Sequence, residues 1–96
     1  MKILPEPISF EWDKGNIDKN LIKHKVTNKE AEEVFSNEPL ISEDVKHSTK
    51  ELRMQILGKT NQDRLLFISF TIRKDKMRII SVRDMNKKEV MVYEQD

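Results

Sequence analysis

Runs of alternating apolar and polar positions are interleaved along this chain with segments of helical spacing. Residues 8–12 alternate and predict a short first strand. Asp13 is a suitable N-cap for a helix over about residues 14–25, and residues 27–30 have the pattern of a capping box that begins a second helix. That second helix is expected to end before Pro39, because the residue that precedes a proline is disfavoured in helical geometry.

The remaining chain contains four further segments with strand character. Residues 40–45 form a candidate second strand and residues 52–57 a third. Residues 64–73 and 78–83 are rich in β-branched and aromatic side chains, and the charged turn at 73–76 joins them as a hairpin.

A last helix is expected to follow these strands, capped by Asp84 and extending towards Tyr93. The predicted order is therefore β-α-α-β-β-β-β-α, within one domain over residues 1–96. This order favours an α+β fold: an antiparallel sheet of four or five strands, two N-terminal helices and one C-terminal helix, with the helices packed on one face.

Composition restricts the possible chemistry. Cysteine is absent, which excludes disulfides and thiolate metal sites. No pattern matches a metal site, a phosphate-binding glycine loop or a Ser/His/Asp set, so no metal or cofactor is expected. The sequence has neither a run of about 18 apolar residues nor the apolar segment of a signal peptide, which predicts a soluble, cytoplasmic protein.

The distribution of charge is more informative than its sum. The net charge is only +1, with −2 on residues 1–50 and +3 on residues 51–96. Long-range attraction of a polyanion is therefore expected to be weak, and recognition has to come from local geometry.

All five arginines lie in the second half, and strand alternation assigns most of them to a face. Arg53, Arg73 and Arg83 are predicted on the polar face, with Arg53 and Arg83 roughly 12 Å apart at the backbone. Arg78 is placed on the core side at a strand entrance, and Arg64 in a turn. The predicted core positions of these strands are Leu52, Met54, Ile56, Leu66, Ile68, Phe70, Ile72, Ile80 and Val82.

Clustered guanidinium groups grip phosphate through paired hydrogen bonds, so this face predicts an RNA ligand. Phe67 is positioned to stack a base, or else to be covered by a protein partner. The alternative is that exposed strands carry arginine to resist edge aggregation. The candidate RNA-binding residues are Phe67, Ser69, Thr71, Ser81 and Arg78.

His47 and Glu51 are candidates for proton transfer beside Arg53. A histidine with an ordinary pKa near 6.5 donates or accepts protons near neutrality. The alternative is an ordinary loop histidine. The predicted catalytic set is Arg53, Arg73, Arg83, His47 and Glu51.

Two groups of motifs together resemble the BrnT family, the toxins of a bacterial type II toxin–antitoxin system. The first group has Phe10 to Asp13, Asn20 to Val26, Glu30-Ala31 and Val34-Phe35. The second has Glu51-x-Arg53, Ile56 to Gly58, Thr71-x-Arg73, Arg78 to Ser81, Arg83, Glu89 and Tyr93-Glu94. The chain departs from the family pattern at Lys25, where glycine is usual, and at Asp84-Met85, where a basic residue and alanine are commoner.

The resemblance implies a RelE-like fold and a ribonuclease that arrests translation. It further implies neutralisation by a DNA-binding antitoxin similar to BrnA, and a complex that represses its own promoter. The primary hypothesis is a metal-independent endoribonuclease in which the arginines stabilise the phosphate while His47 or Glu51 moves protons. The alternatives are a binding module without chemistry, or an inactive toxin that acts only in the antitoxin complex and in promoter repression.

Overall fold

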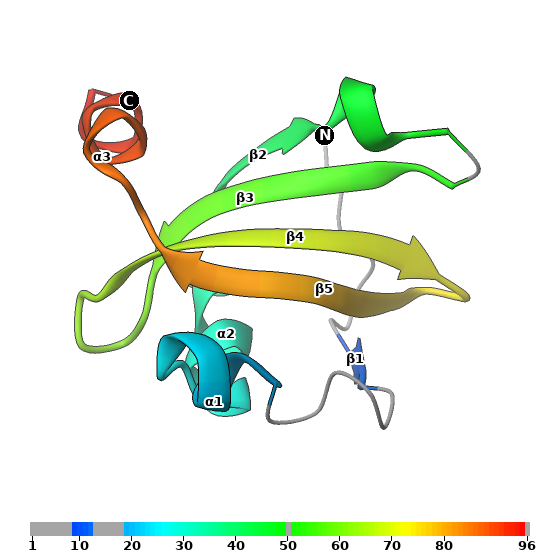
Figure 1. Ribbon diagram of the computed structural model, residues 1–96, viewed down its shortest axis with the longest axis horizontal. Helices are drawn as coiled ribbons and strands as arrows, with labels where there is room; N and C mark the ends of the chain where they lie inside the picture. Colours follow the sequence, from blue (N-terminus) through cyan, green and yellow to red (C-terminus); the bar gives the residue numbers. More distant parts are fainter. Residues whose placement is uncertain (1–8, 13–18, 50, 96) are drawn as a thin grey trace.

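The computed structural model describes residues 9–12, 19–49 and 51–95, and Figure 1 shows its elements. They follow the predicted order, with one added 3₁₀ helix. The elements are β1 (Phe10–Glu11), α1 (Lys19–His24), α2 (Asn28–Val34), β2 (Leu40–Glu43), η1 (Val45–His47), β3 (Arg53–Lys59), β4 (Leu65–Arg73), β5 (Lys76–Asp84) and α3 (Lys87–Glu94). The predicted cap Asp13 and the first turns of the predicted first helix lie outside the described residues. None of the helices in the described ranges is long and apolar enough to cross a membrane.

The five strands form one mixed sheet in the order β1-β5-β4-β3-β2. Neighbours among β2, β3, β4 and β5 are antiparallel, as predicted. The edge strand β1 instead pairs in parallel with β5, so the expectation of an antiparallel sheet is wrong there. Alternation predicts that residues 8–12 form a strand, but it carries no information on direction, which the connection through two helices leaves open. The α+β class is confirmed.

Two of the helices, α2 and α3, begin with a capping box. Thr27 Oγ1 accepts a hydrogen bond from the Glu30 amide at 3.0 Å, and the Glu30 carboxylate accepts one from the Thr27 amide at 2.9 Å, which confirms the predicted capping box. Asn86 forms the same box with Glu89 at the start of α3. The prediction that Asp84 caps this helix is wrong, because Asp84 still belongs to β5.

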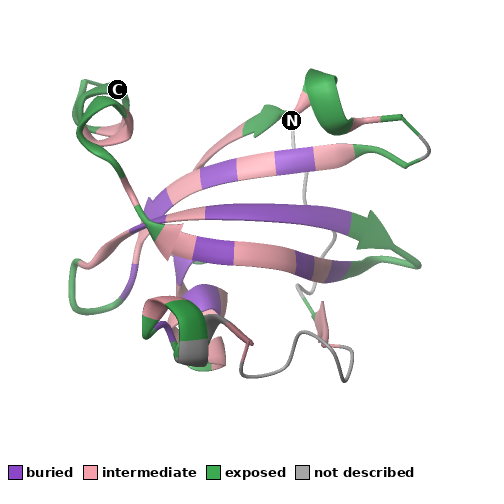
Figure 2. Ribbon diagram, in the orientation of Figure 1, coloured by how far each residue is buried: buried purple, intermediate pink, exposed green. Residues whose placement is uncertain are grey.

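The core lies between α2 and one face of the sheet, which we call the core face. Ala31 and Val34 of α2 are buried there. At Gly58 of β3 an added Cβ would lie 2.6 Å from Val34 Cγ1, so this approach of helix and strand requires glycine. Figure 2 shows the alternation of buried and partly buried residues along β3. The buried hydrophobic strand residues that form the core are Met54, Ile56, Leu66, Ile68, Phe70, Met77, Ile79 and Val82.

Three predicted core positions are wrong. Leu52 is 54% exposed and Ile72 is 36% exposed, because both lie where the sheet extends beyond the core. Ile80 is only partly buried, and its neighbour Ile79 is buried instead.

A β-bulge in β5 explains this exchange. Ser69 of β4 is opposite Ser81, but the next residue, Phe70, is opposite Ile79, so that Ile80 is an extra residue in the ladder. The alternation therefore slips by one position, and both Ile79 and Val82 point to the core. Arg78 and Arg83, on either side of the bulge, both point to the opposite face. The prediction that Arg78 lies on the core side is wrong for this reason.

Lys25, which follows α1, has a left-handed backbone with φ of 57°. Its amide donates to the Leu21 carbonyl at 3.0 Å, and its own carbonyl accepts from Arg64 Nη1 at 2.8 Å, so the conformation is held from both sides. Glycine adopts this helix-ending geometry without the steric cost that a Cβ imposes.

We expect Lys25→Gly to raise the free energy of unfolding by about 0.5–1 kcal/mol, because it removes the left-handed strain. The gain is partly offset, since glycine gives the unfolded chain more conformational entropy to lose on folding. Chemical denaturation measures the change. Lys25→Ala is the matched control: it removes the same charge but keeps the Cβ, and is expected to give no gain. Equal stabilisation by both variants would contradict the backbone explanation.

Candidate active site on the open face

Three arginines from three neighbouring strands come together on the face of β3, β4 and β5 that is turned away from α2, which we call the open face. The strand register places Thr71 of β4 opposite both Arg53 of β3 and Arg78 of β5. Arg73 follows two residues after Thr71 on the same side of β4. From strand spacing, the Arg53 backbone lies about 10 Å from Arg78 and about 8 Å from Arg73. We call Arg53, Arg73 and Arg78 the arginine cluster.

Arg83 does not belong to this cluster. It is opposite Phe67, which is itself opposite Leu57, four residues along β3 from Arg53. That offset is about 14 Å along the strand and two strands across, or about 17 Å between the backbones of Arg53 and Arg83. The predicted separation of roughly 12 Å is therefore wrong, and Arg78 takes the place that the sequence suggested for Arg83.

The Arg83 side chain is held by three neighbours at the other end of the open face, one of which is the Asp84 carbonyl, which accepts from Nη1 at 3.1 Å. Its guanidinium carbon lies 4.2 Å above the centre of the Phe67 ring, a cation–π contact. Its two terminal nitrogens donate to the Glu89 carboxylate at 2.8 and 3.0 Å. Hydrogen bonds from Arg83 hold the pKa of Glu89 below its usual value, and Glu89 in turn raises the pKa of Arg83.

Arg73 and Arg53 of the cluster are held less firmly than Arg83. Arg73 Nη2 lies 3.2 Å from the Glu51 carboxylate in a pair in which both side chains are nearly half exposed. Within the described ranges, the guanidinium of Arg53 makes no hydrogen bond or ion pair. Thr71, between Arg53 and Arg78, is 1% exposed, and its hydroxyl has no hydrogen-bond partner among the described residues. Arginine nitrogens at this end of the sheet therefore offer donors to an anion, and the Thr71 hydroxyl lies buried between the strands that carry Arg53 and Arg78.

His47 is oriented by a carboxylate that the sequence analysis missed. Its Nδ1 lies 2.9 Å from Oδ2 of Asp44, whose side chain is only 12% exposed. Asp44 occupies the N-cap position of η1 but makes no capping hydrogen bond with its side chain. Its pKa is lowered, against the opposing effect of burial, by hydrogen bonds from His47 and Gln55. The Asp-x-x-His spacing was the available signal.

Backbone contacts join this Asp44–His47 pair to Arg53. The Asp44 amide donates to the Arg53 carbonyl at 2.8 Å, and the Arg53 amide donates to Ser48 Oγ at 2.9 Å. Since Gln55 is on the open face, the Asp44 carboxylate lies on that face as well. The structure thus brings His47 and Arg53 together, as the sequence suggested.

The other predicted RNA-binding residues lie along the open face. Ser69 is opposite both Gln55 and Ser81 in the row next to the cluster. Ser69 is buried and Ser81 is partly buried. Phe67 lies one row further on, beneath Arg83.

Comparison with known proteins identifies the family. A family model for the ribonuclease toxin BrnT of type II toxin–antitoxin systems matches residues 12–89. The chain belongs to the BrnT family. The crystal structure of the Brucella abortus ribonuclease toxin BrnT covers 83% of this chain and 99% of its own, with a TM-score of 0.58 and 19% sequence identity, which shows a common fold. A search of curated proteins gives no match.

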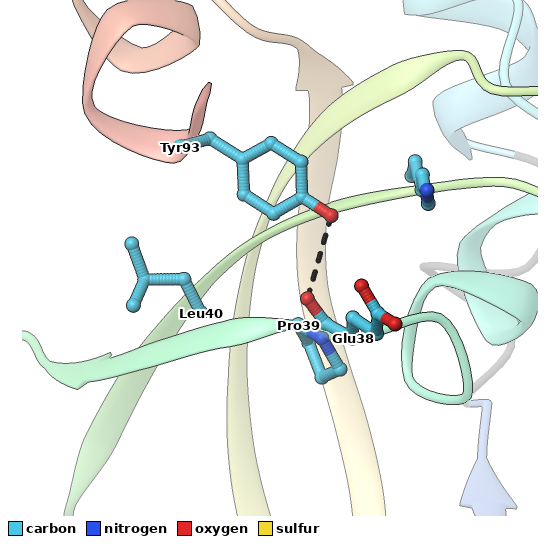
Figure 3. Close-up of a pocket in the computed structure, with 5 residues that line it drawn as sticks. Glu38, Pro39, Leu40 and Tyr93 are labelled. Atoms are coloured by element: carbon cyan, nitrogen blue, oxygen red, sulfur yellow. Dashed lines mark hydrogen bonds between the residues drawn. The ribbon is translucent and has the colours of Figure 1, made fainter. Parts of the chain in front are cut away.

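In this BrnT-family chain α3 lies over the open face, whereas all helices were expected on the other side. Figure 1 shows α3 apart from α1 and α2, with the strands between them. Glu89 and Val92 of α3 line a pocket together with Leu57 and Phe67 of the open face. Further along the helix, the Tyr93 hydroxyl donates to the Glu38 carbonyl at 3.4 Å (Figure 3). The helix is therefore attached near both ends.

We expect Glu89→Gln to weaken the attachment of α3 and to lower the free energy of unfolding at pH 7 by about 0.5–1 kcal/mol. The expected loss is small because the Arg83 side chain is 38% exposed, so that solvent screens the ion pair. The glutamine oxygen still accepts from Asn86, so capping is kept. Because folding lowers the pKa of Glu89, its contribution is present above the unfolded pKa of about 4.3 and is lost as pH falls through the folded value.

Denaturation from pH 7 down to pH 3 measures this effect as a difference between wild type and variant that shrinks in acid. Glu94→Gln, on the same helix and exposed, is the control and is expected to change little. A Glu89→Gln deficit that is the same at every pH would contradict the ion-pair explanation.

Proposed function

We propose that this chain is a metal-independent endoribonuclease that cleaves RNA on the open face, at the arginine cluster beside His47. The observation that carries the proposal is the convergence of Arg53, Arg73 and Arg78 from three strands next to a histidine already oriented by Asp44. Membership of a ribonuclease toxin family supports the same conclusion.

In the proposed reaction the 2′-hydroxyl of one ribose attacks the adjacent phosphorus. The new P–O2′ bond forms while the P–O5′ bond breaks, which leaves a 2′,3′-cyclic phosphate and a free 5′-hydroxyl. The base takes the proton of the 2′-hydroxyl, and water supplies the proton to the leaving 5′-oxygen. Negative charge grows on the phosphoryl oxygens in the transition state, which is where guanidinium donors contribute most.

Arg53 and Arg78 are proposed to hold the phosphate between them. Their backbones are about 10 Å apart, a span that two long side chains close from opposite sides. Thr71 lies between them with a buried hydroxyl that has no hydrogen-bond partner in the described part of the chain, a state that costs about 1–3 kcal/mol. A phosphoryl oxygen that reaches this hydroxyl, once the flanking side chains turn towards the ligand, would remove that cost.

His47 is proposed as the general base. With the Nδ1 proton donated to Asp44, the lone pair of Nε2 is free to accept the proton of the 2′-hydroxyl. Such a residue contributes roughly 10²–10⁴-fold to the rate. Glu51 is assigned to positioning Arg73, because its carboxylate is engaged in that pair. Arg83 is assigned to holding α3, since it lies far from the cluster and is bound by Glu89.

The proposed partner is a DNA-binding antitoxin similar to BrnA, in a complex that represses its own promoter; the family description itself specifies a toxin–antitoxin system. Translation is the proposed process that RNA cleavage stops, in the cytoplasm.

A binding module without chemistry is the second candidate. It is favoured by the two carboxylate pairs, Arg73 with Glu51 and Arg83 with Glu89, which compensate charge on the open face. Such a module would retain RNA without shortening it.

Arg53→Ala and Arg78→Ala are each expected to lower kcat for RNA cleavage by about 10²–10³-fold, the usual loss when one oxyanion donor is removed. Cleavage of a labelled RNA in the presence of a chelator measures this, and growth after induced expression gives a second readout. Arg64→Ala is the matched control for removal of an arginine, because Arg64 binds Asp84 and Glu30 away from the open face. Intact RNA with the wild-type protein would refute the enzyme proposal.

Asp44→Asn is expected to lower kcat roughly 10²-fold and to leave KM for RNA nearly unchanged, because the amide no longer fixes the tautomer of His47. Nitrogen-15 NMR of the imidazole reports the position of the proton independently of activity: on Nδ1 in the wild type, and distributed over both nitrogens in the variant. Asp63→Asn, which removes an exposed carboxylate from a distant loop, is the control. An unchanged NMR spectrum in Asp44→Asn would show that Asp44 does not orient the ring.

A further inference from the structure

The end of the open face opposite the arginine cluster is apolar. The register places Leu40 of β2, Leu57 of β3 and Phe67 of β4 side by side on three neighbouring strands. Val92 of α3 lies over this row, and together these residues line a pocket of about 270 Å³. We call it the apolar pocket. Leu40, Leu57, Phe67 and Val92 do not belong to the core on the other side of the sheet, whereas Ile41, which also lines the pocket, packs against that core.

The charges at this pocket cancel one another. Arg83 lies over the ring of Phe67, and both of its terminal nitrogens are bound by Glu89, so the pair presents no net charge. Such a wall does not attract a phosphate, in contrast to the arginine cluster. Arg83 covers one face of the Phe67 ring, and the rest of that ring together with the aliphatic side chains of Leu40, Leu57 and Val92 offers apolar surface, which favours a neutral ring over a charged group.

Apart from Glu89, which is paired with Arg83, the polar residues that line the pocket lie on the side nearest the cluster. Ser42 and Gln55 are opposite each other in the β2–β3 ladder, and both line the pocket. A hydroxyl and an amide supply a donor and acceptors for the edge of a ring that is stacked against apolar walls. This combination of stacking surface and edge contacts is how proteins bind unpaired bases.

We infer that the apolar pocket binds one nucleobase of the substrate RNA and sets the sequence preference of cleavage. The inference rests on the proposed function for the choice of RNA as ligand. Gln55 lies midway on β3 between Leu57 in the pocket and Arg53 in the cluster, two residues from each. One short single strand therefore has its phosphate at the cluster and a neighbouring base in the pocket.

The size of the pocket favours a base over a segment of a protein partner. Its volume lies below the range of about 300–1,000 Å³ that is usual for drug-sized ligands. A helix or strand of a partner places several side chains in a longer groove. A single planar ring fits the space and the two polar groups beside it.

The test is to fill the pocket with Val92→Trp and to compare this variant with Met91→Trp. Both residues are exposed on α3, at 47% and 61%, but only Val92 lines the pocket. Binding is measured by fluorescence anisotropy with a 2′-O-methyl RNA, which cannot be cleaved, and with a series that carries one abasic position. Cleavage preference is measured by sequencing the ends produced from a randomised RNA pool.

Val92→Trp is expected to weaken RNA binding roughly 10-fold and to abolish the base preference next to the cleaved bond. The affinity that the wild type loses when one position is abasic is expected to be absent in this variant. Met91→Trp is expected to match the wild type. The inference would be overturned if Val92→Trp kept the sequence preference of cleavage and still lost affinity when one position of the RNA is abasic. It would also be overturned if Val92→Trp no longer bound the antitoxin while its RNA binding stayed intact. If the wild type leaves RNA intact, the proposed function fails, while the binding series still decides whether the pocket takes a base.

Discussion

The extra residue in β5 determines what the open face carries. In a regular strand, residues 78 and 83 point to opposite faces, because five positions separate them. The bulge at Ile80 adds one position to the ladder, so that Arg78 and Arg83 share a face while Ile79 and Val82 both reach the core. Without the bulge, one arginine would enter the core or one apolar side chain would leave it. The core and the site are thus coupled by a single irregularity.

The bulge also divides the open face into two regions of different chemistry. Arg78 lies beside Thr71 and Arg53, where donors outnumber carboxylates, whereas Arg83 lies beside Phe67 and Glu89. The second region is where α3 is attached. A helix on this side of the sheet covers the apolar row of the open face and leaves the cluster uncovered. The core needs α2 for its closure, and α3 contributes none of the buried core residues.

The sequence alone predicted the parts of the fold that depend on local rules. The Thr27 capping box, the order of elements and the hairpin with its turn at Lys74 and Asp75 follow from neighbours in the chain, and both turn residues have the positive φ of a tight hairpin. The direction of β1 was missed because the alternation of apolar and polar residues is the same in both directions of a strand. The start of α3 at Asn86 was missed because a second suitable capping residue, Asp84, lies two positions earlier.

The site was predicted only in part, because local rules of strand alternation place some of its residues and not others. Assigning faces by strict alternation placed Arg53, Arg73 and Arg83 on the correct face and Arg78 on the wrong one, because a bulge leaves no mark that alternation can detect. His47 was found from its position before Arg53. Asp44 was missed, although it lies three residues earlier, because residues 40–45 were assigned to a strand and the short 3₁₀ helix that carries His47 was not predicted.

The carboxylate pairs of Arg73 and Arg83 have different consequences for a phosphate ligand. A pair as exposed as Arg73 and Glu51 is worth about 0–1 kcal/mol, so a phosphate can replace the carboxylate at little cost. Arg83 makes two hydrogen bonds to Glu89, whose side chain is 19% exposed, donates a third to the Asp84 carbonyl and also covers Phe67, so its release would break four contacts. With a net charge of only +1, this chain cannot depend on long-range attraction. Its recognition of a polyanion has to use the arginines that cost least to free, and of those whose contacts are described these are Arg53 and Arg73.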